Sequence, residues 1–414
     1  MNYPLFLASR LSLGASGRKS SPAVKVAVAA VALSVTVMLA AVSIVLGFKR
    51  EIRGKVTGFN SHISLYAVPT ELGDDNLLTL TPSLSGLLDK QPYIESYSLE
   101  ASIPAIFKTP DNFKGVYLKS LGGEAIRRFI TSNLEEGEVP EYKPGEKSLK
   151  IVISRMAANQ LGLKVGDKVD TYFMSNDIRV RPLKVAGIFN SHFDSYDDIY
   201  VYGDLSLIQH LGGISGDQGT MLSIHTDDFN RVTEYSERLH NTLLEAMANG
   251  TVYRYYGVDN AYIQGQGYFH WLDLLDTNVV VILTLMAFVA VVTLISGMLI
   301  IIIDKKRFIG LIRSLGASVK ATRKVFLYLA MRVGLLGMLI GNVVALGVLM
   351  AEDKWHFLPL DAEAYYIDFV PVELGWLPVL LLNAGVVLLI WLSLILPSRF
   401  VAKIPPAETM RTEE

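Results

Sequence analysis

The chain has 414 residues and a net charge of −2; 51% of its residues are hydrophobic and 19% are charged, whereas about a quarter of an average soluble protein is charged. It contains no cysteine, which excludes disulfide bonds, a thiolate nucleophile and a cysteine-ligated metal. The net charge indicates no class of partner, and we expect no nucleic-acid partner. The apolar residues are concentrated in a few long runs, which indicates a membrane protein.

Four apolar runs are long enough to cross a membrane. The clearest is uncharged from 279 to 303, and about 20 residues span a hydrocarbon core. The other runs cover 26–48, 325–351 and 374–397. The first run follows a polar N-terminal segment, 1–25, and is about twice as long as the apolar part of a signal peptide. We therefore expect it to be a retained helix.

The charges of the short loops predict the orientation. Residues 304–324 carry seven basic residues and one acid, whereas 352–373 carry six acids and one lysine. Because short basic loops stay in the cytoplasm, we expect 304–324 and both terminal segments, 1–25 and 398–414, inside the cell. The loop 352–373 and the long segment 49–278 then lie outside.

The segment 49–278 is predicted to be an α+β domain on two helical stalks, inserted between the first and second of four transmembrane helices. Alternating patterns predict strands and a period of 3.6 predicts helices. Strands are expected within 62–66, 165–174, 179–189, 197–202, 219–226 and 251–256, and helices within 124–136, 205–211 and 228–248. The stretch 149–163 is expected to hold a strand, then a helix and then a turn that contains glycine. Glu, Pro and Gly cluster at 137–145, which predicts a boundary between two lobes there.

No catalytic or nucleotide-binding motif is present in the sequence, since the phosphate loop, the HExxH zinc helix, the GxSxG elbow and the GxGxxG turn are all missing. Four residues cluster in one short stretch: His192, Asp194, Asp197 and Asp198. Their spacing matches no set of metal ligands and favours a surface turn before a strand. We therefore expect no catalytic residue, metal or cofactor in this chain, and the energy for any work must come from another chain.

The predicted spans contain polar and small residues that need an explanation. Arg332 lies about two turns from the cytoplasmic end of its span, where it can extend to the interface or serve an internal role, and Asn383 lies in the last span. Gly337 and Gly341 form a GxxxG pair, with Gly334 one turn earlier. Such small residues predict close helix packing.

The segment DKKRFIGLIRSLGAS, 304–318, resembles the signature of the FtsX-like permease family, the membrane subunits of MacB-type ABC transporters. In that family the segment forms a short coupling helix that docks on a separate ATPase subunit, which binds ATP and Mg²⁺. Four spans with a large domain after the first are also the layout of that family. The resemblance implies these ATPase-coupling residues: Lys305, Lys306, Arg307, Ile309, Leu311, Ile312, Arg313, Leu315, Gly316 and Ala317.

Within the family, the chain is most similar to the lipoprotein-releasing permeases LolC and LolE. The similar segments are YPLFLASRLSLG, SIVLGFKREIRGKVTGFNSHISL, IVISRMAANQLGLKVGDKV, RPLKVAGIFNSHFDSYDDIYVY and PSRFVAKIPPAETMR. The chain departs from the pattern at Ser154, where a glycine is usual, and at Met410, where a leucine is usual. It also has only FMSNDIRVRP, 173–182, where the carrier-docking member has an extended hairpin, which implies a partner-type subunit or a divergent homodimer.

The resemblance implies a permease subunit in the inner membrane that pairs with a second permease chain, the same or related, above two ATPase subunits. It would extract lipoproteins and pass them to a periplasmic carrier. Two alternatives stay open: MacB-like export of peptides or drugs, and FtsX-type regulation of a cell-wall hydrolase. The missing fused ATPase domain counts against the first alternative, and the large inserted domain counts against the second.

Overall fold

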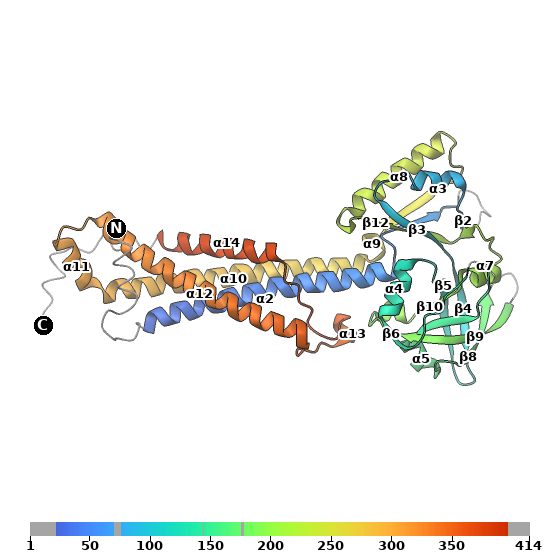
Figure 1. The fold of residues 1–414 in the computed structure, drawn as a ribbon, viewed down its shortest axis with the longest axis horizontal. Coiled ribbons are helices and arrows are strands. Elements are labelled where there is room, and N and C mark those ends of the chain that lie inside the picture. Colours follow the sequence, from blue (N-terminus) through green and yellow to red (C-terminus); the bar gives the residue numbers. More distant parts are fainter. Residues whose placement is uncertain (1–21, 70–75, 144, 175–177, 396–414) are drawn as a thin grey trace. The chain divides into compact units, whose positions relative to one another are not determined.

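A computed structural model describes residues 22–69, 76–143, 145–174 and 178–395 of the chain (Figure 1). Expectations about the terminal segments 1–21 and 396–414 lie outside the described residues. The chain divides into two compact units. The helical unit contains residues up to Arg50, Leu272–Pro359 and the residues from Phe369 onward; the α/β unit contains Glu51–Trp271 and Leu360–Asp368.

The described residues include four helices that are long and apolar enough to cross a membrane. They are α2 (Pro22–Phe59), α10 (Gln266–Asp304), α12 (Val319–Trp355) and α14 (Trp376–Ser393). Valine and isoleucine are frequent in these runs and would favour strands in water. In lipid, a helix satisfies every backbone polar group within one segment, so the same residues form helices there. Both α2 and α10 extend past their apolar runs into the α/β unit.

Glycines bring α12 close to α2 in the helical unit. A Cβ atom on Gly341 would lie 2.6 Å from the carbonyl oxygen of Ala32, and one on Gly337 would lie 2.9 Å from that of Val28. The Thr36 hydroxyl of α2 also donates to the carbonyl of Gly341 at 3.1 Å. The backbones can approach this closely because neither glycine has a side chain.

A pair of asparagines connects α12 with α14. The side-chain amide of Asn342 donates to Asn383 Oδ1 at 2.7 Å, and the amide of Asn383 donates back to Asn342 Oδ1 at 2.9 Å. About two turns further along both helices, a Cβ atom on Gly334 would lie 2.8 Å from Ile390. Asn342, unlike Asn383, is not among the residues singled out in the predicted spans. Each amide satisfies the other in apolar surroundings, where an unpaired amide is costly.

The α/β unit contains two main sheets and a short two-stranded pair, β11-β2. The small sheet has the order β13-β1-β12-β3, and the large sheet has the order β6-β9-β7-β10-β5-β4-β8. The strands are β1 (Ile63–Ala67), β2 (Leu78–Thr79), β3 (Ile94–Glu100), β4 (Ser102–Lys108), β5 (Phe113–Ser120), β6 (Leu134–Gly137), β7 (Lys150–Ser154), β8 (Lys168–Met174), β9 (Ile178–Phe189), β10 (Tyr200–Gly203), β11 (Gln218–Gly219), β12 (Met221–Thr226) and β13 (Tyr256–Asn260).

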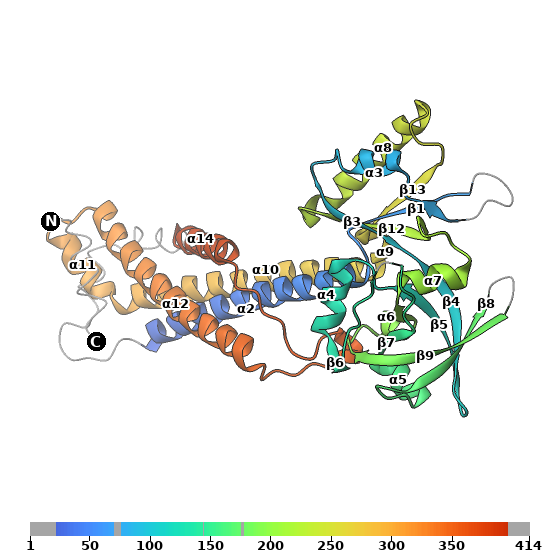
Figure 2. The same ribbon diagram turned by 45° about the vertical axis from the view of Figure 1, so that its right-hand side comes forward.

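Each main sheet has its own helices (Figure 2). Each also has its own core of buried hydrophobic residues. The helices of the α/β unit are α3 (Pro82–Leu88), α4 (Glu124–Ser132), α5 (Arg155–Leu161), α6 (Asp194–Asp197), α7 (Leu205–Gly212), α8 (Val232–Ala248), α9 (Ala261–Gln264) and α13 (Ala362–Tyr365), with a 3₁₀ turn at Phe229–Arg231. We call the small sheet with α3 and α8 the small lobe, and the large sheet with α4, α5 and α7 the large lobe. Leu222 and Leu239 are buried in the small lobe, and Leu118 and Val201 in the large lobe.

The predicted lobe boundary at 137–145 is wrong. Its first residue, Gly137, ends β6, which belongs to the large sheet. The chain instead passes from the small lobe to the large lobe at 100–102 and returns at 219–221. Glu, Pro and Gly also cluster in ordinary surface loops, so this composition does not distinguish a loop within one lobe from a boundary between two lobes.

Two predicted elements are displaced. The strand expected at 251–256 is β13 at Tyr256–Asn260, and Tyr253 is 95% exposed. The helix expected at 124–136 ends at Ser132, because the next residues pair with β9 as strand β6. In both places pairing with a distant strand overrides the local pattern.

The segment Leu360–Asp368, between α12 and α14, is part of the α/β unit; we call it the strap. Lys55 of α2 donates to the carbonyl of Tyr366, and the Tyr366 ring packs against Phe193 and Tyr268 with centroids 5.1 and 5.4 Å away. Tyr366 adopts a left-handed backbone with φ of 62°, which costs about 1–3 kcal/mol for a residue with a side chain. The contacts of the strap offset this cost.

Candidate functional site

A short helix, α11 (Lys306–Ser314), connects α10 with α12 (Figure 1). Its C-terminus is closed by two backbone hydrogen bonds of 3.1 Å, from Gly316 to Arg313 and from Ala317 to Ile312. Gly316 has a φ of 96°, a conformation that favours glycine. These features form a Schellman motif. The Ser318 hydroxyl then accepts from the Ala321 amide at 3.2 Å and caps α12.

The structure divides the ten predicted coupling residues into buried and accessible groups. Ile309 is 0% exposed and Ile312 is 6% exposed, so both anchor α11 in the helical unit and are inaccessible to a partner. Leu311 and Leu315 are 51% and 79% exposed. The other accessible members are Lys305, Lys306, Arg307 and Gly316, whereas Arg313 and Ala317 are half-buried. Anchoring by the isoleucines therefore fixes the direction in which the two leucines project.

Helix stability does not explain the basic residues at the start of α11. Lys305, Lys306 and Arg307 stand at the N-terminus, where the helix dipole disfavours positive charge. The first turn contains no acid that would balance them. Two exposed leucines beside an exposed basic cluster are typical of a surface that contacts a partner.

Three of the four residues clustered at 192–198 have partners within the α/β unit. The buried Asp197 accepts hydrogen bonds from the backbone and hydroxyl of Ser191 at 3.0 and 2.7 Å. His192 Nε2 lies 3.1 Å from Asp368 of the strap, and Asp198 forms an ion pair with a lysine of β5. The side chain of the remaining member, Asp194, lies outside the described atoms. Within the residues that the structure describes, no three His, Asp or Glu side chains gather as metal ligands.

The glycines that were predicted to pack helices lie at two different contacts. Gly337 and Gly341 face α2, and Gly334 faces α14. Arg332, on the same helix, has an exposed side chain. Asn342 is a strongly polar residue within a span that sequence reasoning missed, although its amide next to Gly341 in an apolar run was an available signal.

Comparison with known proteins identifies the family. The sequence model of the MacB-like periplasmic core domain matches residues 26–242, more than half of the chain. The chain belongs to the family of MacB-like permeases. The FtsX-like permease C-terminal model matches residues 280–406 of the permease and includes α11. The family resemblance inferred from 304–318 is therefore confirmed.

Named relatives cover nearly the whole permease. The "Lipoprotein-releasing system transmembrane protein LolC" of Neisseria meningitidis serogroup B is 25% identical, with 94% of each chain covered. The "Lipoprotein-releasing system transmembrane protein LolE" of Haemophilus influenzae is 24% identical, with 99% of each chain covered. The solved periplasmic region of MacB from Actinobacillus actinomycetemcomitans is 16% identical with a TM-score of 0.35, covering 52% of the permease and 96% of that chain.

These matches establish the class of protein. The permease is a membrane subunit of an ABC transporter, and such subunits are not themselves ATPases. Its system therefore includes an ATPase and membrane partners.

Proposed function

We propose that the permease extracts lipoproteins from the inner membrane and hands them to a periplasmic carrier, driven by a separate ATPase that docks on α11. Support for the substrate comes from the lipoprotein-releasing relatives, which match over nearly the full length. Support for the docking site comes from α11, because its two exposed leucines and basic cluster project from an anchored helix. Each CH₂ group removed from lipid costs about 0.8 kcal/mol, so release of several acyl chains requires coupling to ATP.

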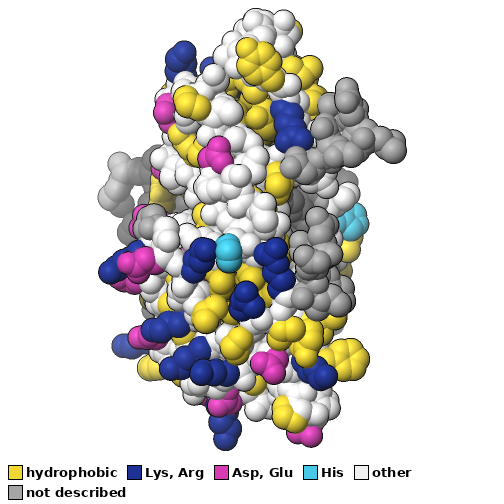
Figure 3. All heavy atoms as spheres, turned by 90° about the vertical axis from the view of Figure 1, so that its right-hand side faces the viewer, with side chains coloured by type: hydrophobic (Ala, Val, Ile, Leu, Met, Phe, Trp, Pro, Cys, Tyr) yellow, Lys and Arg dark blue, Asp and Glu magenta, His cyan; other side chains and the backbone are white. Residues whose placement is uncertain are grey.

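The proposal includes an orientation. The basic segment around α11 and both termini lie in the cytoplasm, and the α/β unit lies in the periplasm. The face of the α/β unit shown in Figure 3 has many Lys and Arg side chains, with acids and apolar residues among them, as expected of a surface in water. Two permease chains then stand above two ATPases, and α2 and α10 transmit the movement of the ATPases to the α/β unit.

Reporter fusions test this orientation. A reporter that is active only in the cytoplasm, fused after Ala317, is expected to be active because the segment around α11 is basic. The same reporter fused after Asp361 is expected to be silent, because the acidic loop is translocated. The reverse pattern would overturn both the orientation and the assignment of α11.

Release from proteoliposomes tests the substrate. Vesicles that contain the permease, its ATPase and a triacylated lipoprotein are expected to release the lipoprotein to a soluble carrier only when ATP is added. The measurement is the lipoprotein in the supernatant, with ADP as control. ATP hydrolysis without release, combined with export of a peptide or drug, would favour MacB-like export. Activation of a cell-wall hydrolase without release would favour FtsX-type regulation.

A further inference from the structure

The two lobes of the α/β unit meet through polar residues. Ser64, Ser223 and Ser98 lie side by side on adjacent strands of the small sheet, on the face opposite the small-lobe core. A Cβ atom on Gly123, which precedes α4 of the large lobe, would lie 2.9 Å from Ser98 Oγ. In the described part of the chain, the buried Oγ atoms of Ser98 and Ser223 have no hydrogen-bond partner. Such atoms weaken an interface, so the serines do not hold the lobes firmly together.

A cleft of about 580 Å³ lies between the lobes. His62 and His225 line it from the small lobe, and Arg128 and Phe129 line it from α4. Burial lowers the pKa of His62 to about 4 and also lowers the pKa of His225, so both rings are neutral at neutral pH. The histidines therefore add no ionic attraction across the cleft. Separate cores and a polar, hollow interface are typical of domains that move relative to each other.

The two chain crossings between the lobes are joined. The Thr220 amide donates to the Glu100 carbonyl at 2.9 Å, and the Ser102 amide donates to Thr220 Oγ1 at 3.1 Å. Segments 100–102 and 219–221 thus form one hydrogen-bonded hinge, and any change in the angle between the lobes must bend it.

Lys119 connects this hinge to the end of α2. It lies on β5 of the large lobe, and its Nζ is 3.1 Å from Glu100 Oε2 and 3.1 Å from the carbonyl oxygen of Phe59, the last residue of α2. The side chains of Lys119 and Glu100 are 8% and 5% exposed. A cation is favoured there because the last carbonyls of a helix lack intrahelical partners.

The end of α2 is also seated firmly on the large lobe. A Cβ atom on Gly58 would lie 2.2 Å from the ring of Phe129 on α4. The Phe59 ring packs against Phe129 and Tyr196 with centroids 4.8 Å away in both cases. Movement of α2 therefore reaches the large lobe by packing and reaches the hinge through Lys119.

We propose that Lys119 is a positioning residue that links α2 to the hinge, so that displacement of α2 changes the angle between the two lobes. This inference rests on the proposed function, in which ATP moves α2. Stability alone is a poor reason for the pair, since replacement of a buried ion pair by apolar residues is often neutral or stabilising. The pair is instead placed where three parts meet: the helix end, the hinge and β5.

The test uses the full permease with its ATPase and compares Lys119→Met/Glu100→Leu with the wild type. The double replacement leaves no unpaired buried charge but removes the donor to the Phe59 carbonyl. Its melting temperature is therefore expected to fall only slightly below that of the wild type. Lys119→Arg keeps the charge and is expected to retain coupling. A matched control removes the exposed pair Lys150→Met/Glu138→Leu, whose atoms lie 2.9 Å apart.

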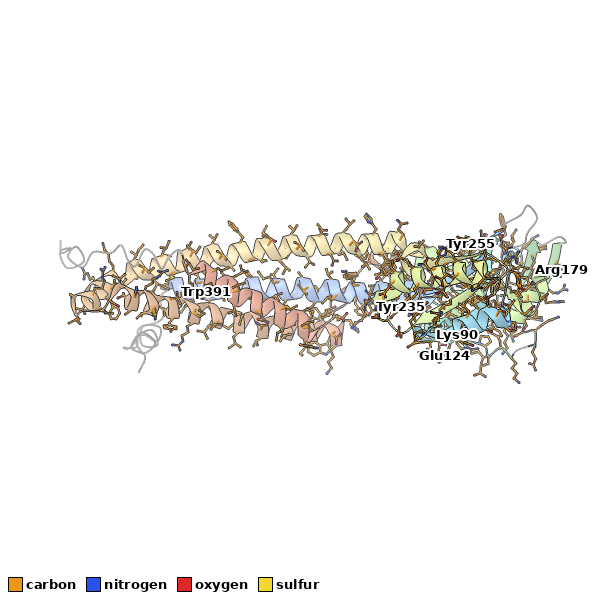
Figure 4. The ribbon with its side chains drawn as sticks, turned by 90° about the horizontal axis from the view of Figure 1, so that it is seen from above. Lys90, Glu124, Arg179, Tyr235, Tyr255 and Trp391 are labelled. Carbon is orange, nitrogen blue, oxygen red and sulfur yellow. The ribbon has the colours of Figure 1, made fainter. Side chains whose placement is uncertain are left out.

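Spin labels report the angle between the lobes. Because the chain has no cysteine, Lys90→Cys on the small lobe and Lys164→Cys on the large lobe can be labelled selectively (Lys90 is labelled in Figure 4). In the otherwise wild-type protein, the distances between the labels at positions 90 and 164 are expected to form a narrow distribution. This distribution is expected to shift when ATP is trapped in the ATPase. In Lys119→Met/Glu100→Leu the distribution broadens, the shift is lost, and lipoprotein released per ATP falls about tenfold.

The outcomes separate the two proposals. The role of Lys119 would be refuted if Lys119→Met/Glu100→Leu kept a narrow distance distribution and the shift seen in the wild type. It would also be refuted if the distance between the lobes of the wild type did not change with ATP. A wild type that shifts with ATP but releases no lipoprotein would refute the proposed substrate and leave the link between α2 and the hinge intact.

Discussion

The variant Gly316→Leu is expected to insert and fold but to abolish the stimulation of ATP hydrolysis by the permease. Gly316 has a φ of 96°, and a Cβ atom there would meet nothing within 4 Å in its own chain. Because of the positive φ, leucine strains the backbone at this position by about 1–2 kcal/mol. Relief of this strain displaces the end of α11, where Leu315 is exposed. The measurement is the rate of ATP hydrolysis by the co-purified ATPase. In cells, lipoproteins of the outer membrane are expected to accumulate in the inner membrane.

A matched control isolates the role of α11. Gly162 also has a positive φ, 66°, and a Cβ atom there also meets nothing within 4 Å. Gly162→Leu thus introduces similar strain at the end of α5, far along the chain from α11, and is expected to keep normal stimulation. If Gly316→Leu retains normal coupling and lipoprotein sorting, α11 is an ordinary connection and the docking proposal fails.

A second large effect is expected from Gly341→Leu, which should separate α12 from α2 and destabilise the helical unit by about 3 kcal/mol or more. The Cβ atom would lie 2.6 Å from the backbone oxygen of Ala32, which has no rotamer to move away. The measurement is unfolding of the purified permease in mixed micelles with increasing denaturing detergent.

The control for this variant lies on the same helix. Gly347 is exposed, and a Cβ atom there would meet nothing within 4 Å. Gly347→Leu changes the same residue type on α12 and is expected to unfold like the wild type. Equal unfolding of both variants would show that the contact between α2 and α12 is looser than described.

Hydropathy alone locates the long helices, because crossing lipid requires a continuous apolar run and little else. The run 279–303 lies within α10. The order of the strands cannot be obtained this way. β10 pairs parallel with β5 and antiparallel with β7, and nothing in the sequence between 200 and 203 specifies those partners. Such pairings are decided by packing over long separations.

The candidate site was predictable in part. Resemblance identified the segment 304–318, and its glycine indicated a helix end. Which side chains are accessible was not predictable, because Ile309 and Leu311 have the same hydropathic character yet are buried and exposed, respectively. The contact between Lys119 and Glu100 was also not predictable from the sequence, because charged residues on strands are usually at the surface. Their contact depends on how the fold brings β3 and β5 together.

The strap has a consequence for biochemical work on the α/β unit. Its residues, Leu360–Asp368, follow α12 in the chain and cover the rings of Phe193 and Tyr268. A recombinant fragment cut from Glu51–Trp271 would lack the strap and expose the faces of those rings that Tyr366 covers. A binding study with that fragment would offer partners a surface that the intact chain keeps covered, whereas a fragment with 360–368 spliced back would present the native one.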